Sequence, residues 1–174
     1  MGFRTIQGLK WARLVERPSS IPKGRPKGAK ALGVRYEKSL AKILGTRVLY
    51  GQWFEYEDRA GHGWGQSDFL IRAAPGEVSE SIVVLESKYT WTPEGHEQIE
   101  RLYTPLVEAI WQIPVRGVVV CKNLLDQKAM KGIVVCEKLC EAQALARNHS
   151  KVVWHWLGGY MSEPFEPGAW TGMI

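Results

Sequence analysis

The chain has 174 residues, of which 45% are hydrophobic and 24% charged, an ordinary balance for one globular domain with its own core. No apolar run is long enough to cross a bilayer and no apolar leader opens the chain, so we expect a cytoplasmic protein rather than a membrane or secreted one. The three cysteines form no CxxC pair, which argues against a disulfide framework or a zinc site.

Positive charge is concentrated near the N-terminus. Residues 1–36 carry nine Lys and Arg residues and one acidic residue, whereas residues 37–174 have a net charge of −3. A cationic arm on a mildly acidic domain indicates a polyanionic partner, most often nucleic acid. The alternative is a solvated tail that only aids solubility. We expect residues 1–30 to form a basic flexible arm and residues 31–174 to form a single domain.

Proline, glycine and serine are frequent between residues 17 and 28, which predicts an extended or flexible segment. Its run Lys23-Gly24-Arg25-Pro26-Lys27 resembles the AT-hook, a short arm that lies in the DNA minor groove. We therefore expect DNA contacts from cationic side chains in and just after this segment, namely Lys23, Arg25, Lys27, Lys30 and Arg35.

The next elements follow from hydrophobic spacing and glycine content. Apolar residues at helical spacing predict a helix over residues 33–44, with Glu37 at the margin of its buried stripe. Residues 47–54 suggest a strand or hairpin. Residues 55–66 are polar and rich in glycine, which predicts a mobile loop that leads into Asp68.

Two short runs rich in β-branched and aliphatic residues then predict buried strands, over residues 68–71 and 82–88, with a turn at residues 74–77 between them. Thr92-Pro93-Glu94 is a typical helix start, and Pro105 should kink or end that helix. The remaining expected elements are a strand over residues 117–121, a helix over residues 137–147 and a strand over residues 152–156, whereas residues 122–136 fit no single element. This order predicts an α/β domain with a central mixed β-sheet flanked by helices.

Three ionisable residues stand on the two apolar runs: Asp68 heads the first, and Glu86 and Lys88 close the second. Residues i and i+2 of a strand share a face, so Glu86 and Lys88 point the same way. A buried carboxylate is usually paired or bound to metal, because its burial alone is costly. If the two strands are neighbours, these residues form a divalent-metal site with a basic group beside it. For Glu86 and Lys88 alone, a structural ion pair is the simpler interpretation.

A helical Glu, a later Asp and a Glu-x-Lys at the end of a hydrophobic strand resemble the signature of the PD-(D/E)xK nuclease superfamily. The matching residues are Glu37, Asp68, Glu86 and Lys88, and Ser67 stands where the superfamily name has Pro. The resemblance covers residues 30–121. It implies a restriction-endonuclease-like core and a metal-dependent endonuclease that hydrolyses phosphodiester bonds in DNA.

The resemblance also implies a role for each matching residue. Asp68 and Glu86, with the backbone carbonyl of Ser87, would bind Mg²⁺, for which Mn²⁺ could substitute. Glu37 would bind a second metal ion or position a metal-bound water, and Lys88 would orient or deprotonate the attacking water. Such ions fit the chemistry, because phosphodiester hydrolysis adds negative charge to a phosphate that is already anionic.

Within the superfamily the pattern is most similar to the archaeal-type Holliday junction resolvases, in which a basic N-terminal segment leads into a helix with the catalytic Glu. Residues 27–40 are similar to that opening. The resemblance implies a homodimer that cuts two strands of a four-way DNA junction, since a two-fold dimer suits a two-fold substrate. The long stretch between Glu37 and Asp68 and the extra C-terminal region depart from the compact archaeal pattern.

Two other functions stay open. A recombination or repair exonuclease of the same superfamily would carry a Gln-xxx-Tyr motif on the helix after the Lys, but Gln98 and Tyr103 are one residue too far apart for it. Gln98 could still contact DNA phosphate. A catalytically inert DNA-binding module is the other alternative. In any of these proteins, a tryptophan near the site could stack on an unpaired base, the candidates being Trp53, Trp64 and Trp91.

Overall fold

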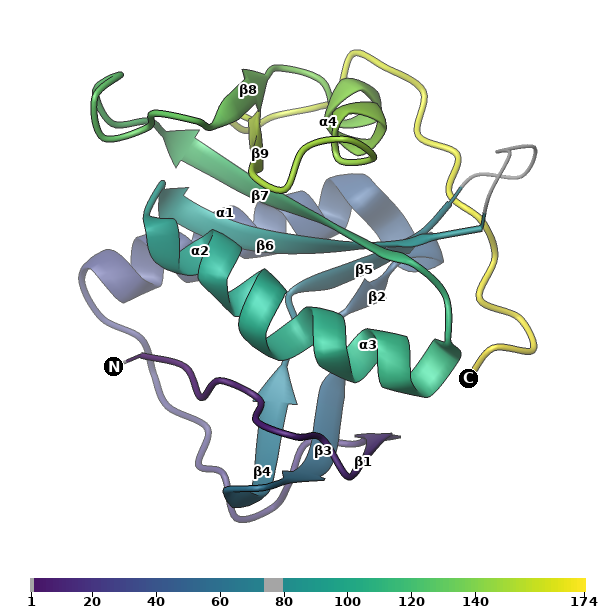
Figure 1. The fold of residues 1–174 in the computed structure, drawn as a ribbon. Helices are drawn as coiled ribbons and strands as arrows, with labels where there is room; N and C mark the ends of the chain where they lie inside the picture. The colour runs from purple at the N-terminus through teal and green to yellow at the C-terminus, as the bar shows by residue number, and fades with distance from the viewer. Residues whose placement is uncertain (1, 74–79) are drawn as a thin grey trace.

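The computed structural model describes residues 2–73 and 80–174, and it contains two β-sheets with helices packed around the larger one (Figure 1). The expected turn at residues 74–77 lies outside the described residues. In chain order the elements are β1 (Trp11–Val15), α1 (Ala29–Leu44), a 3₁₀ turn η1 (Gly45–Arg47), β2 (Leu49–Tyr50), β3 (Trp53–Asp58), β4 (Gly61–Gln66), β5 (Phe69–Arg72), β6 (Ile82–Thr90), α2 (Pro93–Gln98), a π-helical turn η2 (Ile99–Tyr103), α3 (Thr104–Trp111), β7 (Val115–Asn123), β8 (Val134–Cys136), α4 (Leu139–Leu145) and β9 (Val152–His155). Within these described ranges, no helix is both long and apolar enough to span a membrane.

The central sheet has six strands in the order β2-β5-β6-β7-β9-β8. Strands β2, β5 and β6 are antiparallel neighbours, whereas β6, β7, β9 and β8 run parallel to one another. Its two edge strands are short, with two residues in β2 and three in β8. The expected α/β fold with a mixed central sheet is therefore confirmed, whereas the finer restriction-endonuclease-like assignment stays a prediction.

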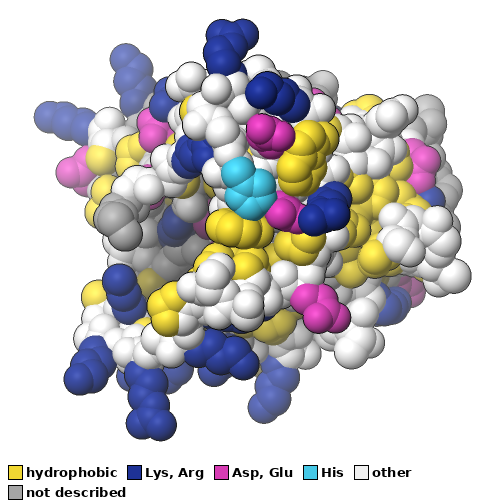
Figure 2. Space-filling view, turned by 90° about the horizontal axis from the view of Figure 1, so that it is seen from below, with side chains coloured by type: hydrophobic (Ala, Val, Ile, Leu, Met, Phe, Trp, Pro, Cys, Tyr) yellow, Lys and Arg dark blue, Asp and Glu magenta, His cyan; other side chains and the backbone are white. Residues whose placement is uncertain are grey.

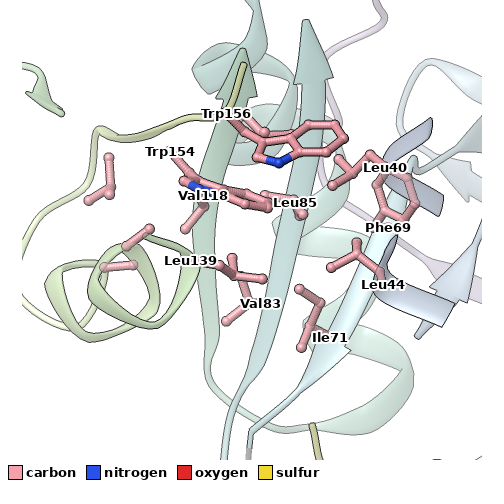
Figure 3. Close-up of a cluster of buried hydrophobic side chains, with 14 of the residues drawn as sticks. Leu40, Leu44, Phe69, Ile71, Val83, Leu85, Val118, Leu139, Trp154 and Trp156 are labelled. Carbon is pink, nitrogen blue, oxygen red and sulfur yellow. The ribbon is translucent and has the colours of Figure 1, made fainter. Parts of the chain in front are cut away.

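Side chains that alternate along the central strands fill a separate hydrophobic core on each face of this sheet. Val83 and Leu85 face α1 and α4, and Trp154 and Trp156 complete that layer (Figure 3). The opposite face packs against α2, η2 and α3, in front of the sheet in Figure 1. Two buried faces explain why these strands read as nearly continuous apolar runs.

A second, three-stranded antiparallel sheet has the order β1-β3-β4 and lies below the central sheet in Figure 1. Its presence corrects the expectation of a mobile loop over residues 55–66, which instead form most of the β3–β4 hairpin. The glycines are needed for close packing: a Cβ on Gly63 would lie 2.7 Å from the Tyr56 ring, and Gly65 faces Leu102 and Tyr103. Glycine thus marks tight contact here rather than mobility.

The N-terminal segment is also part of the fold, so a flexible arm over residues 1–30 is wrong for much of that range. Strand β1 pairs with β3, and the Ile6 N–H donates to the Arg101 carbonyl at 2.9 Å. The Arg4 guanidinium pairs with the fully buried carboxylate of Asp58. Contacts between such distant residues leave no local signal in the sequence. Residues 16–28, between β1 and α1, contain no helix or strand, as expected for an irregular segment.

The helices largely match their predicted positions. Helix α1 begins at Ala29, four residues before the expected start, and ends at Gly45, whose φ of 74° favours glycine. The helix that starts at Pro93 does not end at Pro105. The helix widens into the π-helical turn η2 just before this proline and continues as α3. Pro105 lies in the first turn of α3, where the backbone N–H that proline lacks is not required.

Candidate active site

The pairing of β5 with β6 brings Asp68 beside Glu86 and Lys88. In this antiparallel register Phe69 lies opposite Leu85, so Asp68, just before β5, reaches the segment that follows Leu85. The Ser87 backbone N–H donates to Asp68 Oδ2 at 2.7 Å. The neighbouring strands inferred from the sequence are therefore present, and the two predicted halves of the site meet at one end of β5.

Glu86 is the most deeply buried carboxylate of this group, with a residue exposure of 4%. Its Oε1 lies 3.4 Å from Lys88 Nζ, whereas Oε2 is buried and has no hydrogen-bond partner among the described residues. Burial raises the pKa of Glu86 to about 7, although the nearby Lys88 ammonium opposes that rise. A structural ion pair satisfies only one of the two oxygens, and the second is left for another cation or donor.

Lys88 lies between Glu86 and Gln98. Its Nζ donates to Gln98 Oε1 at 2.6 Å, and 24% of its side chain is exposed. Gln98, at the end of α2, thus holds the ammonium group from the side opposite β6. These two contacts hold Lys88 in place, and its side chain is still accessible to solvent. Its ammonium group could therefore contact a bound phosphate.

Glu37 approaches from α1 and interacts with the same group of charges. Burial raises its pKa, while a hydrogen bond with the Tyr50 side chain and the charge of Lys88 lower it. Burial is also the main reason that the pKa of Asp68 is raised, followed by the charges of Glu86 and Glu37. The three carboxylates therefore repel one another, and a positive ion among them would relieve that repulsion.

Two tyrosines complete the site and were not among the predicted site residues. The Tyr50 ring stacks on Phe69 with centroids 4.9 Å apart, and its hydroxyl bonds to Glu37. Partial burial and the charge of Glu37 raise the pKa of Tyr50 to about 12. The Tyr103 hydroxyl donates to the Gln66 carbonyl at 2.5 Å, two residues before Asp68. No sequence pattern pointed to Tyr50, whereas Tyr103 could be found through the Gln-xxx-Tyr comparison.

The side chains present determine which metal ion this site could hold. In the described part of the chain, no group of three or more His, Cys, Asp and Glu side chains is arranged to hold a metal ion. A site here would therefore combine Asp68 and Glu86 with the Ser87 carbonyl and with water. That composition suits Mg²⁺, which takes oxygen ligands and retains several waters. The unpartnered oxygen of Glu86 and the mutual repulsion of the carboxylates fit such an ion.

Gln98, on α2, lies apart from the five cationic residues predicted to contact DNA. Lys23, Arg25 and Lys27 are exposed on the irregular segment, and Lys30 and Arg35 are exposed on α1. Figure 2, a view from below, shows Lys and Arg side chains around much of the margin of that face.

The three tryptophans that were candidates for base stacking differ in exposure. Trp91 is 2% exposed and its N–H donates to His96, so burial rules it out as a stacking group. Trp64 is 41% exposed, whereas Trp53 is half-buried beneath the guanidinium of Arg17. Only Trp64 and, in part, Trp53 therefore remain accessible.

Comparison with protein-family models, with curated proteins and with solved structures finds no match for this chain. A function for it must therefore be argued from the chemistry of the site.

Proposed function

We propose that this protein is a metal-dependent endonuclease that hydrolyses phosphodiester bonds in DNA. The observation that carries the proposal is the buried Glu86 carboxylate, which lies beside Lys88 and near Asp68 and has one oxygen that no described residue bonds. A protein with no use for this carboxylate would gain stability by replacing it with an apolar residue. Keeping it suggests that it binds a cation that the chain alone does not supply.

Each residue of the site then has a defined task. Asp68, Glu86 and the Ser87 carbonyl would hold Mg²⁺ or Mn²⁺, and Glu37 would hold a second ion or orient a water. When bound, the metal neutralises phosphate charge and makes a water more acidic. Lys88, held by Gln98, would orient the attacking water and stabilise the charge that develops on the phosphate. Tyr50 would hold Glu37 in place through its hydroxyl.

Branched DNA, and the four-way junction in particular, is the substrate that we propose for this site. Support comes from the order of the matching residues, with Glu37 on a helix preceded by an exposed basic segment. We further propose that the active form is a homodimer, because two equivalent sites could cut both strands of a two-fold junction.

An exonuclease of the same superfamily is the second candidate, and one observation favours it. Gln98 and Tyr103 are five residues apart, whereas the Gln-xxx-Tyr motif needs four. The π-helical turn between them adds one residue to the helical turn, so residues five apart lie on the same side. Gln98 contacts Lys88, and Tyr103 contacts the strand that leads to Asp68. The five-residue spacing of Gln98 and Tyr103 is therefore compatible with the exonuclease alternative.

A cleavage panel separates the candidates. Labelled four-way junctions, flaps, linear duplexes and single strands are incubated with the protein and Mg²⁺, or with EDTA as the metal-free control. Paired cuts near the branch point support a junction resolvase, whereas degradation that needs a free end supports an exonuclease. Binding without cleavage of any substrate in Mg²⁺ or Mn²⁺ would overturn the nuclease proposal and leave an inert DNA-binding module.

A further inference from the structure

The three-stranded sheet has an outward face whose side chains the proposed chemistry does not use. We call it the outer sheet face. The register of β1, β3 and β4 arranges its nine residues in three cross-strand rows, Trp11–Glu57–His62, Arg13–Glu55–Trp64 and Val15–Trp53–Gln66. The alternate residues, such as Phe54 and Tyr56, are buried against the helices. All packing of this sheet is therefore made by its other face.

The aromatic side chains on the outer sheet face contact one another but stay partly in solvent: the His62 ring lies 6.2 Å from the Trp11 ring and 4.4 Å from the Trp64 ring, centroid to centroid. Trp11 is 39% exposed and Trp64 is 41% exposed, and they stand on opposite sides of the central strand β3. Every inner position of β4 is glycine, so all the side chains of this strand lie on the outer face. They belong to His62, Trp64 and Gln66. Large apolar rings kept in solvent on a rigid sheet are typical of a binding surface.

The two acids on this face, Glu55 and Glu57, are outnumbered by the cations Lys10, Arg13 and Arg17 on and beside it. Each acid already has cationic or N–H partners: Glu55 accepts from Arg13 and contacts His62, and Glu57 accepts from the Trp11 indole. Arg13 stacks over the Trp11 ring at 5.7 Å, and Arg17 stacks over Trp53 at 5.5 Å. Guanidinium groups beside indole rings form a surface that can stack with bases and bind phosphates by charge.

The outer sheet face is joined to the candidate active site by a short stretch of chain. Gln66 ends its last row, and the chain passes from there through Ser67 to Asp68. On the other side, Arg17 opens the irregular segment that carries Lys23, Arg25 and Lys27 to α1 and Glu37. A strand lying on this face would thus have basic residues beside it and the carboxylates at its end.

We propose that the outer sheet face binds single-stranded DNA, with bases stacked on Trp64 and Trp11 and phosphates held by Arg13, Arg17 and the basic segment. Stacking requires unpaired bases, so this face selects single strands over duplex DNA. The inference deepens the proposed function and rests on it, because among branched DNA substrates it favours those with an unpaired strand, such as a flap, over a fully paired four-way junction.

Fluorescence anisotropy of a labelled oligothymidylate, measured in EDTA to prevent cleavage, tests the proposal. Trp64→Ala and Trp11→Ala should each weaken binding by about 5- to 100-fold, the usual loss for one stacked base. Trp64→Phe should retain most of the affinity because it keeps a ring. Tyr160→Ala is the matched control, since Tyr160 is 82% exposed on the C-terminal tail. A duplex of equal length should bind more weakly and respond less to these changes.

Three results would overturn this inference. The first is unchanged oligothymidylate binding by both alanine variants with melting temperatures like that of the wild type. The second is equal losses for single strands and duplex. The third is a dimer that becomes monomeric in Trp11→Ala or Trp64→Ala, measured by light scattering, which would make the face an interface between copies. The nuclease proposal fails separately, if Mg²⁺ supports no cleavage while the tryptophan variants still lose binding.

Discussion

The two sheets of this protein differ in how much of their surface serves the core. Strands β6, β7 and β9 have central segments that are buried on both faces, over residues 82–86, 118–121 and 152–154, with α1 and α4 on one side and α2 to α3 on the other. The three-stranded sheet buries only its inner face and leaves indoles and charges outside.

This difference teaches where binding residues can accumulate. The buried segments of the central sheet pack on both faces, whereas one face of the smaller sheet is only partly covered and keeps Trp11 and Trp64 exposed. The candidate active site lies where they meet, since Ser67 and Asp68 join β4 of one sheet to β5 of the other. The proposed substrate surface and the proposed chemistry thus occupy adjacent parts of the two sheets.

The largest effect is expected at this junction. Asp68→Asn or Glu86→Gln should lower the cleavage rate by about 100-fold or more, because each removes a proposed metal ligand, while DNA binding stays near normal. Rates on the preferred substrate of the cleavage panel, with affinity measured in EDTA, check this. Glu80→Gln is the control, because Glu80 is exposed and pairs with Arg72. Full activity in either site variant would remove the metal-ligand assignment.

The two sheets should respond differently to loss of a large side chain. Leu85→Ala removes a fully buried residue of the central sheet and should lower the free energy of unfolding by about 2 to 5 kcal/mol. Trp64→Ala removes an exposed ring and should change it by about 0.5 kcal/mol or less. Urea denaturation of both variants measures the contrast. Equal destabilisation would mean that the outer sheet face contributes to folding after all.

The pKa of Glu86 in the central sheet is raised to about 7, so its contribution to the free energy of unfolding depends on pH. A carboxyl whose pKa is raised in the folded state stabilises the fold below its unfolded pKa, and that stability is lost as the pH rises through about 7. Glu86→Gln should therefore raise the free energy of unfolding of the metal-free protein by about 2 to 3 kcal/mol above pH 7. The gain should vanish near pH 4. Melting temperatures across this range test it, and a gain of equal size at all pH values would contradict it.

Glycine in β4 gives a smaller effect on stability. Gly63→Ala places a methyl group against the Tyr56 ring and should cost about 1 to 3 kcal/mol by overpacking. Gly24→Ala is the matched control, because no atom of the described residues, apart from its own chain neighbours, lies within 4 Å of the added carbon. Thermal denaturation of the two variants compares them. If Gly63→Ala is as stable as the control, glycine is not required where the Tyr56 ring of β3 lies against β4.

Removal of charge from the basic segment should have the mildest consequence. Replacing Lys23, Arg25 and Lys27 by alanine should weaken DNA binding and reduce the slope of log affinity against log salt by about 2 to 3, one phosphate contact for each lost charge. Deletion of residues 1–28 is unsuitable for this test, because it also removes β1. Anisotropy at several salt concentrations gives the slope. An unchanged slope would show that this segment does not contact phosphate.

The central sheet could be predicted from the sequence because its strands must be apolar on both faces, as residues 82–85 and 118–120 are. The same apolar runs correctly brought Asp68 beside Glu86 and Lys88. The order of charged residues on strongly apolar strands was therefore a sufficient guide to this part of the site.

The rest depended on contacts that sequence spacing does not encode. Glycine at alternate positions of β4 resembles a loop until the Tyr56 ring is known to lie 2.7 Å from where a Cβ would be. The docking of the N-terminus needs Arg4 to meet Asp58, far along the chain. Counting residues between Gln98 and Tyr103 assumed a regular α-helix, which the π-helical turn is not.

The short edge strands of the central sheet limit how two copies of this chain can associate. With two residues in β2 and three in β8, each edge presents few unpaired backbone groups to a neighbour. A second molecule therefore gains little by continuing the sheet, and fibril-like stacking is disfavoured for the same reason. A homodimer formed at an edge of the central sheet would therefore depend on side-chain contacts, so point substitutions there should be able to dissociate it without unfolding either subunit.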